Sequence, residues 1–209
     1  MLSNTSQKDT QKYTFASVKN NRFRVWDKEK QVEFYYDTIS GYLTDIRTYV
    51  DEFGRYVIPK WRFYFQSNVD PREFTVISSA KDSRFSEDFV FKLATYIDAV
   101  RSGAVKDDSK LLLVQATLYD RPVNGKTQSK TYIVANGSPC STRYISGQPN
   151  PDWQKPFGLD WVVVPTHTWV EGPYGVVKVP SKERAELIEK LVANIQDFLK
   201  EDSNSPVPF

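Results

Sequence analysis

The spacing of hydrophobic residues changes in the middle of the chain, and this change restricts the folds that the chain can adopt. Residues 61–66 read Trp-Arg-Phe-Tyr-Phe-Gln, an alternation that is typical of a β-strand with two different faces. Residues 89–100 instead place apolar side chains at helical spacing, at Phe89, Leu93, Tyr96, Ile97 and Val100. The chain is therefore predicted to form a sheet whose strands are interrupted by a helix.

Turn residues and the change of period divide the central region into five strands and one helix. The predicted strands span residues 42–49, 61–66, 73–78, 111–119 and 130–135. Ser86 is the predicted cap of the helix, acidic residues follow it in the first turn, and Gly103 ends the helix. Three strands, a helix and two strands is the element order of a five-stranded OB-fold barrel.

We therefore predict a mainly β (α+β) protein. It comprises a five-stranded OB-fold barrel with an inserted helix between strands three and four, an additional β-containing region and a C-terminal helix. Gly41 favours a barrel because it precedes the long first strand, and strong curvature is where a barrel tolerates glycine. An antiparallel α+β domain of another kind is the alternative.

The N-terminal region is predicted to lie outside the five barrel strands. Residues 1–12 are polar and aperiodic, which indicates a disordered arm, and the main domain is expected to span residues 13–180. Residues 32–36 have the strongest extended character in the segment before the barrel. They are expected to form an edge strand or an arm that lies over the barrel.

The C-terminal third contains three predicted segments. Residues 137–180 are rich in Pro, Gly, Ser and Trp and indicate an insertion packed on the barrel, with short strands at 161–164 and 176–179. Residues 181–200 carry one apolar stripe and predict an amphipathic helix. Residues 201–209 are predicted to be a flexible tip.

The residue types in the chain argue against an enzyme, a metal site or a cofactor. Cys140 is the only cysteine, so an intrachain disulfide and a thiolate metal cluster are both excluded. His167 is the only histidine and has no motif around it, so we expect it to be structural. The chain also lacks the roughly 20-residue apolar run of a membrane span, and its polar N-terminus does not resemble a signal peptide. A cytoplasmic location is expected.

The charge and aromatic content leave a binding function open. The net charge is only +2, which does not by itself indicate nucleic-acid binding. Aromatic residues make up 14% of a chain whose mean hydropathy is negative, so some rings are expected to face solvent or a ligand. Packing inside a β-rich core is the competing explanation for the same rings.

Basic and aromatic side chains recur where an OB barrel binds oligonucleotides, on strand two and in the loops that join strands one to two and four to five. Basic groups neutralise phosphates and rings stack on bases without needing a particular base sequence. An exposed Arg beside a Tyr is also a common cross-strand pair, so only the convergence of many such residues is informative. The expected DNA-binding residues are Arg47, Tyr49, Arg55, Tyr56, Lys60, Arg62, Tyr64, Tyr119, Arg121, Lys126, Lys130 and Tyr132.

The last residues and the strand order together resemble a known family. The chain ends in Pro208-Phe209, with Glu201 and Asp202 a little upstream, and its strand two and the Ser-Ser that closes strand three are similar to those of phage proteins. These features resemble single-stranded DNA-binding proteins of the bacterial and phage type over residues 32–136 and the tip. The resemblance implies that Phe209, Pro208 and the acids bind replication or repair partners. Only two acids stand near the end, so the tip departs from the family pattern.

The function expected from these patterns is sequence-tolerant binding of single-stranded DNA in replication, recombination or repair, by a protein that is phage-encoded. The main alternative is a structural or interaction protein, such as a phage virion component, whose aromatic strands pack against neighbouring subunits. RNA binding is a third hypothesis, since stacking tolerates either sugar. A homo-oligomer is compatible with each of them.

Overall fold

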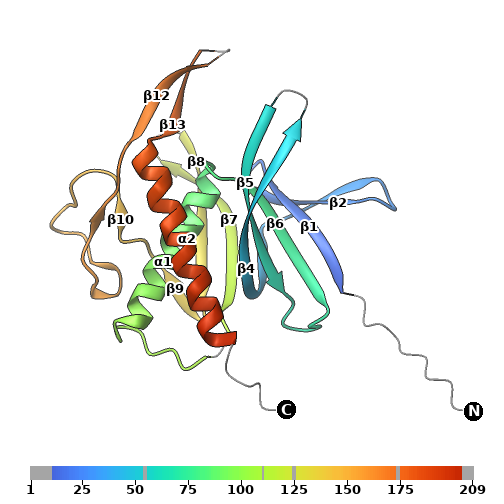
Figure 1. The fold of residues 1–209 in the computed structure, drawn as a ribbon, viewed down its shortest axis with the longest axis horizontal. Coiled ribbons are helices and arrows are strands. Elements are labelled where there is room, and N and C mark those ends of the chain that lie inside the picture. Colours follow the sequence, from blue (N-terminus) through green and yellow to red (C-terminus); the bar gives the residue numbers. More distant parts are fainter. Residues whose placement is uncertain (1–10, 54–55, 110, 124–125, 173–174, 204–209) are drawn as a thin grey trace, which may run out of the picture.

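The computed structural model describes residues 11–53, 56–109, 111–123, 126–172 and 175–203. It is mainly β, with one large mixed sheet and two long helices (Figure 1). The sheet has nine strands in the order β3-β2-β1-β6-β5-β4-β7-β8-β9. In chain order they are β1 (Lys12–Lys19), β2 (Arg22–Asp27), β3 (Val32–Tyr36), β4 (Thr38–Phe53), β5 (Tyr56–Gln66), β6 (Glu73–Ala80), β7 (Leu113–Val123), β8 (Lys126–Ala135) and β9 (Ser138–Cys140).

The prediction of a mainly β, α+β protein is confirmed, but the sheet is not a closed five-stranded barrel. Strand β6 pairs in parallel with β1, from Lys12 opposite Glu73 to Ser17 opposite Ser78. On the other side of the sheet, β8 pairs with β9, from Ile133 opposite Cys140. The β6 edge that a five-stranded barrel would join to β8 is therefore occupied by β1, and the last three residues of β8 pair with β9.

The additional strands follow from tight turns that the sequence prediction did not use. Lys19 pairs with Arg22, and the two residues between them, Asn20 and Asn21, have φ of 50° and 54°. Asparagine tolerates this left-handed region, and a two-residue turn of this kind joins twisted antiparallel strands. Strand β1 thus begins at Lys12, inside the segment predicted to be a disordered arm. The extended segment 32–36 is an edge strand, β3.

Strand β4 is long and serves two parts of the sheet. Its first residues pair with β7, from Thr38 opposite Thr117, whereas its later residues pair with β5 as far as Phe53 opposite Tyr56. The register shifts between Leu43 and Asp45. A Cβ on Gly41 would lie 2.6 Å from the carbonyl oxygen of Gln66, so only glycine fits where β4 crosses β5.

The helix α1 (Arg84–Arg101) packs its apolar stripe on the inner face of the sheet. Its cap is Ser83, whose Oγ accepts a hydrogen bond from the Ser86 amide, so the prediction of Ser86 as the cap is wrong by three residues. The Ser86 side chain is instead fully buried. Gly103, with φ of 76°, follows the cap residue Ser102 and ends the helix as predicted.

The second helix, α2 (Lys182–Ser203), lies beside α1 (Figure 1). A buried ion pair joins the two helices: the Arg184 Nε and Nη2 atoms each donate to one Glu87 carboxylate oxygen at 2.8 Å. The Arg184 Nη1 atom also donates to the carbonyl oxygen of Pro165, at 2.9 Å. Because both charges are buried and hydrogen-bonded to each other, removal of either one would leave an unpaired charge in the core.

The region predicted as an insertion, residues 137–180, contains small β elements around β9. The short strands β10 (Tyr144–Ile145) and β11 (Val162–Val163) pair in parallel, with the 3-10 turn η1 (Pro156–Gly158) between them in sequence. Strands β12 (His167–Gly172) and β13 (Gly175–Pro180) form a hairpin. Tyr144 and Val164 are buried in the main core, so this region is packed on the sheet.

Candidate functional site

The alternation of β5 separates a core face from an outer face. Trp61, Phe63 and Phe65 are at most 2% exposed and belong to the core, as predicted, and the Phe63 and Phe65 rings contact Phe89 of α1. The intervening side chains point to the opposite, outer face. The strand register places Arg47 opposite Arg62 and Tyr49 opposite Lys60. Five residues of the predicted DNA-binding set therefore lie together on two adjacent strands: Arg47, Tyr49, Lys60, Arg62 and Tyr64.

Arg62 has the most constrained side chain on this outer face. Its guanidinium carbon lies 3.4 Å from the centroid of the Tyr49 ring and 5.9 Å from that of the Phe15 ring. The Nε atom is buried and has no hydrogen-bond partner among the described residues. A guanidinium that stacks on a ring retains its charge and its in-plane N–H donors. Arg62 is therefore oriented by aromatic contacts rather than by a carboxylate.

Two other basic residues of the face have carboxylate partners. Arg47 Nε donates to Asp45 Oδ2 at 2.5 Å, and this hydrogen bond is the main cause that raises the pKa of Arg47. Lys60 Nζ donates to Asp51 Oδ2 at 2.6 Å. The two pairs reduce the net positive charge of the face. Because such partly exposed pairs contribute at most about 1 kcal/mol, a phosphate can compete for these cations.

Strands β1 and β6 add aromatic residues to the same face that the sequence prediction missed. Tyr13 and Phe15 are 47% and 56% exposed, and Tyr13 stacks on Phe74 with ring centroids 5.2 Å apart. The parallel register places Phe15 beside Val76. The period-two spacing of Tyr13 and Phe15 was a signal for a strand, but its position in the sheet depends on a pairing between distant segments.

We call the resulting surface the aromatic-basic face. It is formed by the outward side chains of β1, β6, β5 and β4, and its cations alternate with rings: Arg47 lies 5.0 Å from the Tyr64 ring centroid, just as Arg62 lies on Tyr49. Its members are Tyr13, Phe15, Arg47, Tyr49, Lys60, Arg62, Tyr64 and Phe74.

The other predicted residues form a second group on β7 and β8. Tyr119 lies opposite Lys130, Tyr132 opposite Thr117, and Arg121 follows two residues after Tyr119 on the same side of its strand. Tyr119 and Tyr132 are both more than 40% exposed. These strands pair with the first half of β4, whereas Arg47 and Tyr49 lie in its second half. The predicted set is therefore divided between two parts of the sheet.

The remaining predicted residues are described only in part. Arg55, Pro208 and Phe209 lie outside the described residues, and so do the side chains of Tyr56, Lys126 and Asp202. Glu201 belongs to α2 rather than to the expected tip, because that helix continues to Ser203. Its carboxylate accepts a hydrogen bond from Arg101 Nη2 at 3.0 Å, which ties the end of α2 to the end of α1.

The single cysteine and the single histidine of the chain both lie in structural surroundings. Burial raises the pKa of the Cys140 thiol to about 12, so it is protonated at neutral pH. His167 Nε2 lies 3.6 Å from Glu87 Oε1, beside the ion pair that joins the two helices. The described residues contain no cluster of three or more His, Cys, Asp or Glu side chains arranged to hold a metal.

We compared the chain with protein families, curated proteins and solved structures. No family model, curated protein or solved structure matches the chain. The likeness to single-stranded DNA-binding proteins thus stays a prediction. Among the helices of the described residues, none has the length and apolar character to cross a membrane.

Proposed function

We propose that the chain binds single-stranded DNA across its aromatic-basic face. The observation that carries the proposal is the Arg62 guanidinium, which lies on the Tyr49 ring and whose buried Nε has no hydrogen-bond partner among the residues that the structure describes. Buried polar groups normally have hydrogen-bond partners, and an exception at an exposed face is a candidate ligand contact. A phosphate oxygen is a suitable acceptor for a guanidinium held in this way.

The rings around Arg62 support the nucleic-acid ligand, since Tyr13 and Phe15 are exposed and Tyr64 is partly exposed. Tyr13, Phe15 and Tyr64 present aromatic surface on which bases can stack, at about 1–3 kcal/mol per base. In this proposal the cations follow the sugar-phosphate backbone while the rings hold the bases. Since every base has an aromatic face, the binding is sequence-tolerant. Duplex DNA, whose bases are already stacked, is a poor competitor.

The OB-fold assignment is part of this proposal. Strands β4, β5, β6, β7 and β8 would be the five barrel strands, with α1 inserted between the third and the fourth. Their adjacency in the order β6-β5-β4-β7-β8 is compatible with an OB barrel that has opened between β6 and β8, where β1 now pairs with β6. The aromatic-basic face then covers the strands by which OB folds usually bind oligonucleotides.

The proposal is tested by fluorescence anisotropy of a labelled poly-dT oligomer at two salt concentrations, with duplex DNA as competitor. We expect binding that weakens as salt rises, because phosphate contacts release counterions. We also expect that the duplex does not displace the oligomer. Absence of binding at low salt would exclude the function. A matched RNA oligomer, used as a second competitor, separates a DNA-binding from an RNA-binding protein.

The C-terminal tip extends the proposal to protein partners. The resemblance to single-stranded DNA-binding proteins implies that Pro208 and Phe209 enter pockets on replication or repair proteins. Deletion of both residues should therefore spare poly-dT binding and abolish recruitment of these partners. Pull-down of replication and repair proteins by the full chain and by the deletion variant measures this effect. Equal recovery of partner proteins by the full chain and by the deletion variant would show that the tip does not recruit them.

A structural or interaction protein is the second candidate function, and the sheet edge and hairpins favour it. Strand β3 is an edge strand and all five of its residues are exposed. The β12–β13 hairpin exposes Trp169 by 67% and Val176 by 60%. Exposed apolar surface and an unpaired strand edge are features of protein interfaces. Failure to bind poly-dT, together with salt-insensitive self-association, would favour this candidate.

A further inference from the structure

The outward side chains of the large sheet form a row that continues past the aromatic-basic face. Arg62 on β5 lies opposite Ser78 on β6, and Ser78 lies beside Ser17 on β1. Ser17 lies opposite Arg24 on β2, and Arg24 lies opposite Tyr35 on β3. Residues in register point to the same side of a sheet. The row therefore crosses five adjacent strands and joins the aromatic-basic face to the β2–β3 hairpin.

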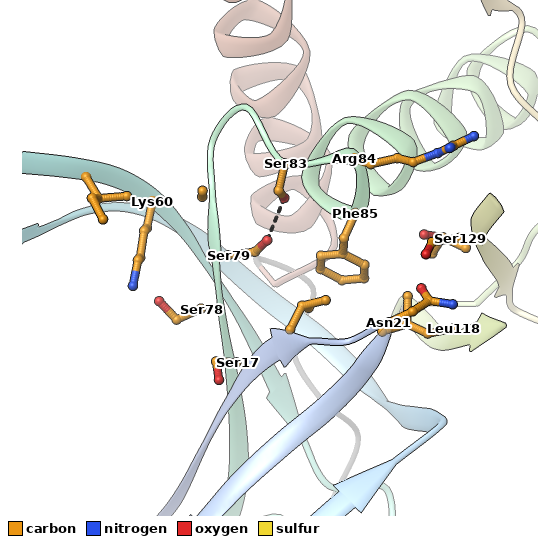
Figure 2. Close-up of a pocket in the computed structure, with 14 residues that line it drawn as sticks. Ser17, Asn21, Lys60, Ser78, Ser79, Ser83, Arg84, Phe85, Leu118 and Ser129 are labelled. Carbon is orange, nitrogen blue, oxygen red and sulfur yellow. Dashed lines mark hydrogen bonds between the residues drawn. The ribbon is translucent and has the colours of Figure 1, made fainter. Parts of the chain in front are cut away.

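Side-chain contacts confirm that the middle of this row faces away from α1. Arg24 Nε donates to Ser17 Oγ at 3.2 Å, so the two side chains lie on one side of the sheet. Figure 2 shows Ser78 on the opposite side of β6 from Ser79, whose Oγ lies 2.6 Å from that of Ser83 at the cap of α1. The serines of the row are thus on the outer face.

Small hydroxyl residues separate the two arginines of the row. Ser17 and Ser78 line a hollow of about 400 Å³, and Lys60 lines it as well. Three strand spacings separate Arg62 from Arg24, which is about 14 Å at the usual distance between neighbouring strands. Two guanidinium groups with hydroxyl donors between them suit the phosphates of one nucleic-acid strand.

Two cations share one carboxylate on this side of the hairpin. Arg24 Nη1 lies 3.0 Å from Glu33 Oε1, and Lys19 Nζ lies 3.7 Å from Glu33 Oε2. The Tyr35 hydroxyl also donates to the Glu33 carboxylate. The cluster therefore has an excess of positive charge. Because ion pairs between partly exposed side chains are weak, a phosphate can replace the carboxylate at either cation.

Two exposed rings accompany these cations. Trp26 is 49% exposed and Tyr35 is 39% exposed. Trp26 follows two residues after Arg24 on β2 and lies opposite Glu33, so it belongs to the same side of the sheet. Bases stack on such rings whatever their sequence. The hairpin thus repeats the combination of cations and rings that defines the aromatic-basic face.

We propose that the path of single-stranded DNA continues from the aromatic-basic face onto the β2–β3 hairpin. Trp26 and Tyr35 stack on bases there, while Arg24 and Lys19 contact phosphates. This inference rests on the proposed function and extends it to two strands outside the OB-fold assignment. The hairpin lengthens the binding site, so its contribution depends on the length of the bound strand.

Fluorescence anisotropy with a poly-dT series of about 4 to 16 nucleotides, the range of OB-fold site sizes, tests the extension. Affinity of the wild type should rise until an oligomer spans both parts of the path. Trp26→Ala with Tyr35→Ala should weaken binding of the longest oligomer about 10-fold and spare the shortest. Arg24→Ala should lower the slope of log affinity against log salt by about 0.7 for the longest oligomer.

Phe34→Ala is the matched control within the same hairpin. Phe34 precedes Tyr35 on β3 and has nearly the same exposure, 38%, but alternation directs it to the other side of the sheet. Its substitution should leave the binding of every oligomer unchanged. An equal loss of affinity in Phe34→Ala and in the Trp26 and Tyr35 variant would overturn the extension, because the hairpin would then act through the fold.

Failure of the extension differs from failure of the aromatic-basic face. The extension alone is overturned if the hairpin variant binds every length like the wild type while Arg62→Ala, Tyr64→Ala loses affinity. Both proposals are overturned if no poly-dT oligomer binds the wild type. Sedimentation velocity of the wild type and the hairpin variant tests a protein contact. Loss of self-association without loss of poly-dT affinity would overturn the DNA path and assign the hairpin to a protein interface.

Discussion

The side chains on the two faces of strand β5 differ in burial, polarity and contacts. On the inner face, Phe63 is fully buried and its ring centroid lies 4.7 Å from that of Phe89. On the outer face, Arg62 and Tyr64 contact rings and cations that remain partly open to solvent. Neighbouring residues on the same strand therefore have separate roles: the inner ones stabilise the fold, and the outer ones are available for a ligand.

Phe63→Ala should have the largest effect on stability. It removes a fully buried ring that also contacts Phe85, at a centroid distance of 5.8 Å, and should lower the free energy of unfolding by about 3–5 kcal/mol. Chemical denaturation measures this loss. Tyr64→Ala on the outer face is the matched control and should cost less than about 1 kcal/mol. Equal losses would show that the outer face is also part of the core.

The double variant Arg62→Ala, Tyr64→Ala should reduce ligand affinity and not stability. We expect poly-dT affinity to fall about 10- to 100-fold, because one phosphate contact and one stacking ring are lost, while thermal stability stays nearly unchanged. Anisotropy and thermal denaturation measure the two quantities. Trp153→Ala with Lys155→Ala removes an exposed ring and a cation away from the sheet and should leave affinity unchanged. Unaltered affinity of the first variant would reject the proposed face.

Asp107→Asn should show that a polar group on the helix side also contributes to stability. Burial raises the pKa of Asp107, but hydrogen bonds from Asn136 and Tyr96, both at 2.7 Å, outweigh it and leave the pKa below its ordinary value. The stabilisation is thus present above the ordinary pKa and is lost as pH falls through the lower, folded-state pKa.

We expect Asp107→Asn to lower the free energy of unfolding by about 1–2 kcal/mol at neutral pH. The difference from the wild type should shrink in acid. Denaturation curves collected across the acidic range measure both quantities. A constant difference at every pH would mean that the carboxylate charge is not responsible.

Asp45→Asn makes the same substitution on the outer face and should have the smallest effect. It frees Arg47 from its carboxylate, so poly-dT affinity should rise about 2- to 5-fold at low salt, with a stability change below about 0.5 kcal/mol. Anisotropy measures the gain. Asp152→Asn, at an exposed site elsewhere, controls for net charge. Weaker binding by Asp45→Asn would instead mean that Asp45 positions Arg47 for the ligand.

Local patterns in the sequence predicted most of the central elements. The alternation at Trp61, Phe63 and Phe65 correctly separated the two faces of β5, because side chains on a strand alternate by geometry. The helical spacing that ends at Gly103 predicted α1. The cap was placed at Ser86 because acidic residues follow it directly, but the structure buries Ser86 and Glu87 and begins the helix after Ser83.

The residues of the candidate site were only partly predicted from the sequence. Arg47, Tyr49, Arg62 and Tyr64 were predicted and lie together, since a hairpin pairs residues that are close in sequence. Tyr13 and Phe15 were missed because they join the face only through the parallel pairing of β1 with β6, some 60 residues away. Tyr119 and Lys130 were placed with the first group but lie on the other part of the sheet.

The sequence by itself determined the central local elements of this protein: the strands and the helix from β4 to β8, the helix α2, and which side chains of β5 face the core. These follow from hydrophobic period and turn residues, which act over a few positions. Only the tertiary structure decided that the large sheet does not close into a barrel and that β1 extends it. Pairing of distant segments depends on the packing of the whole core, and no local pattern encodes it.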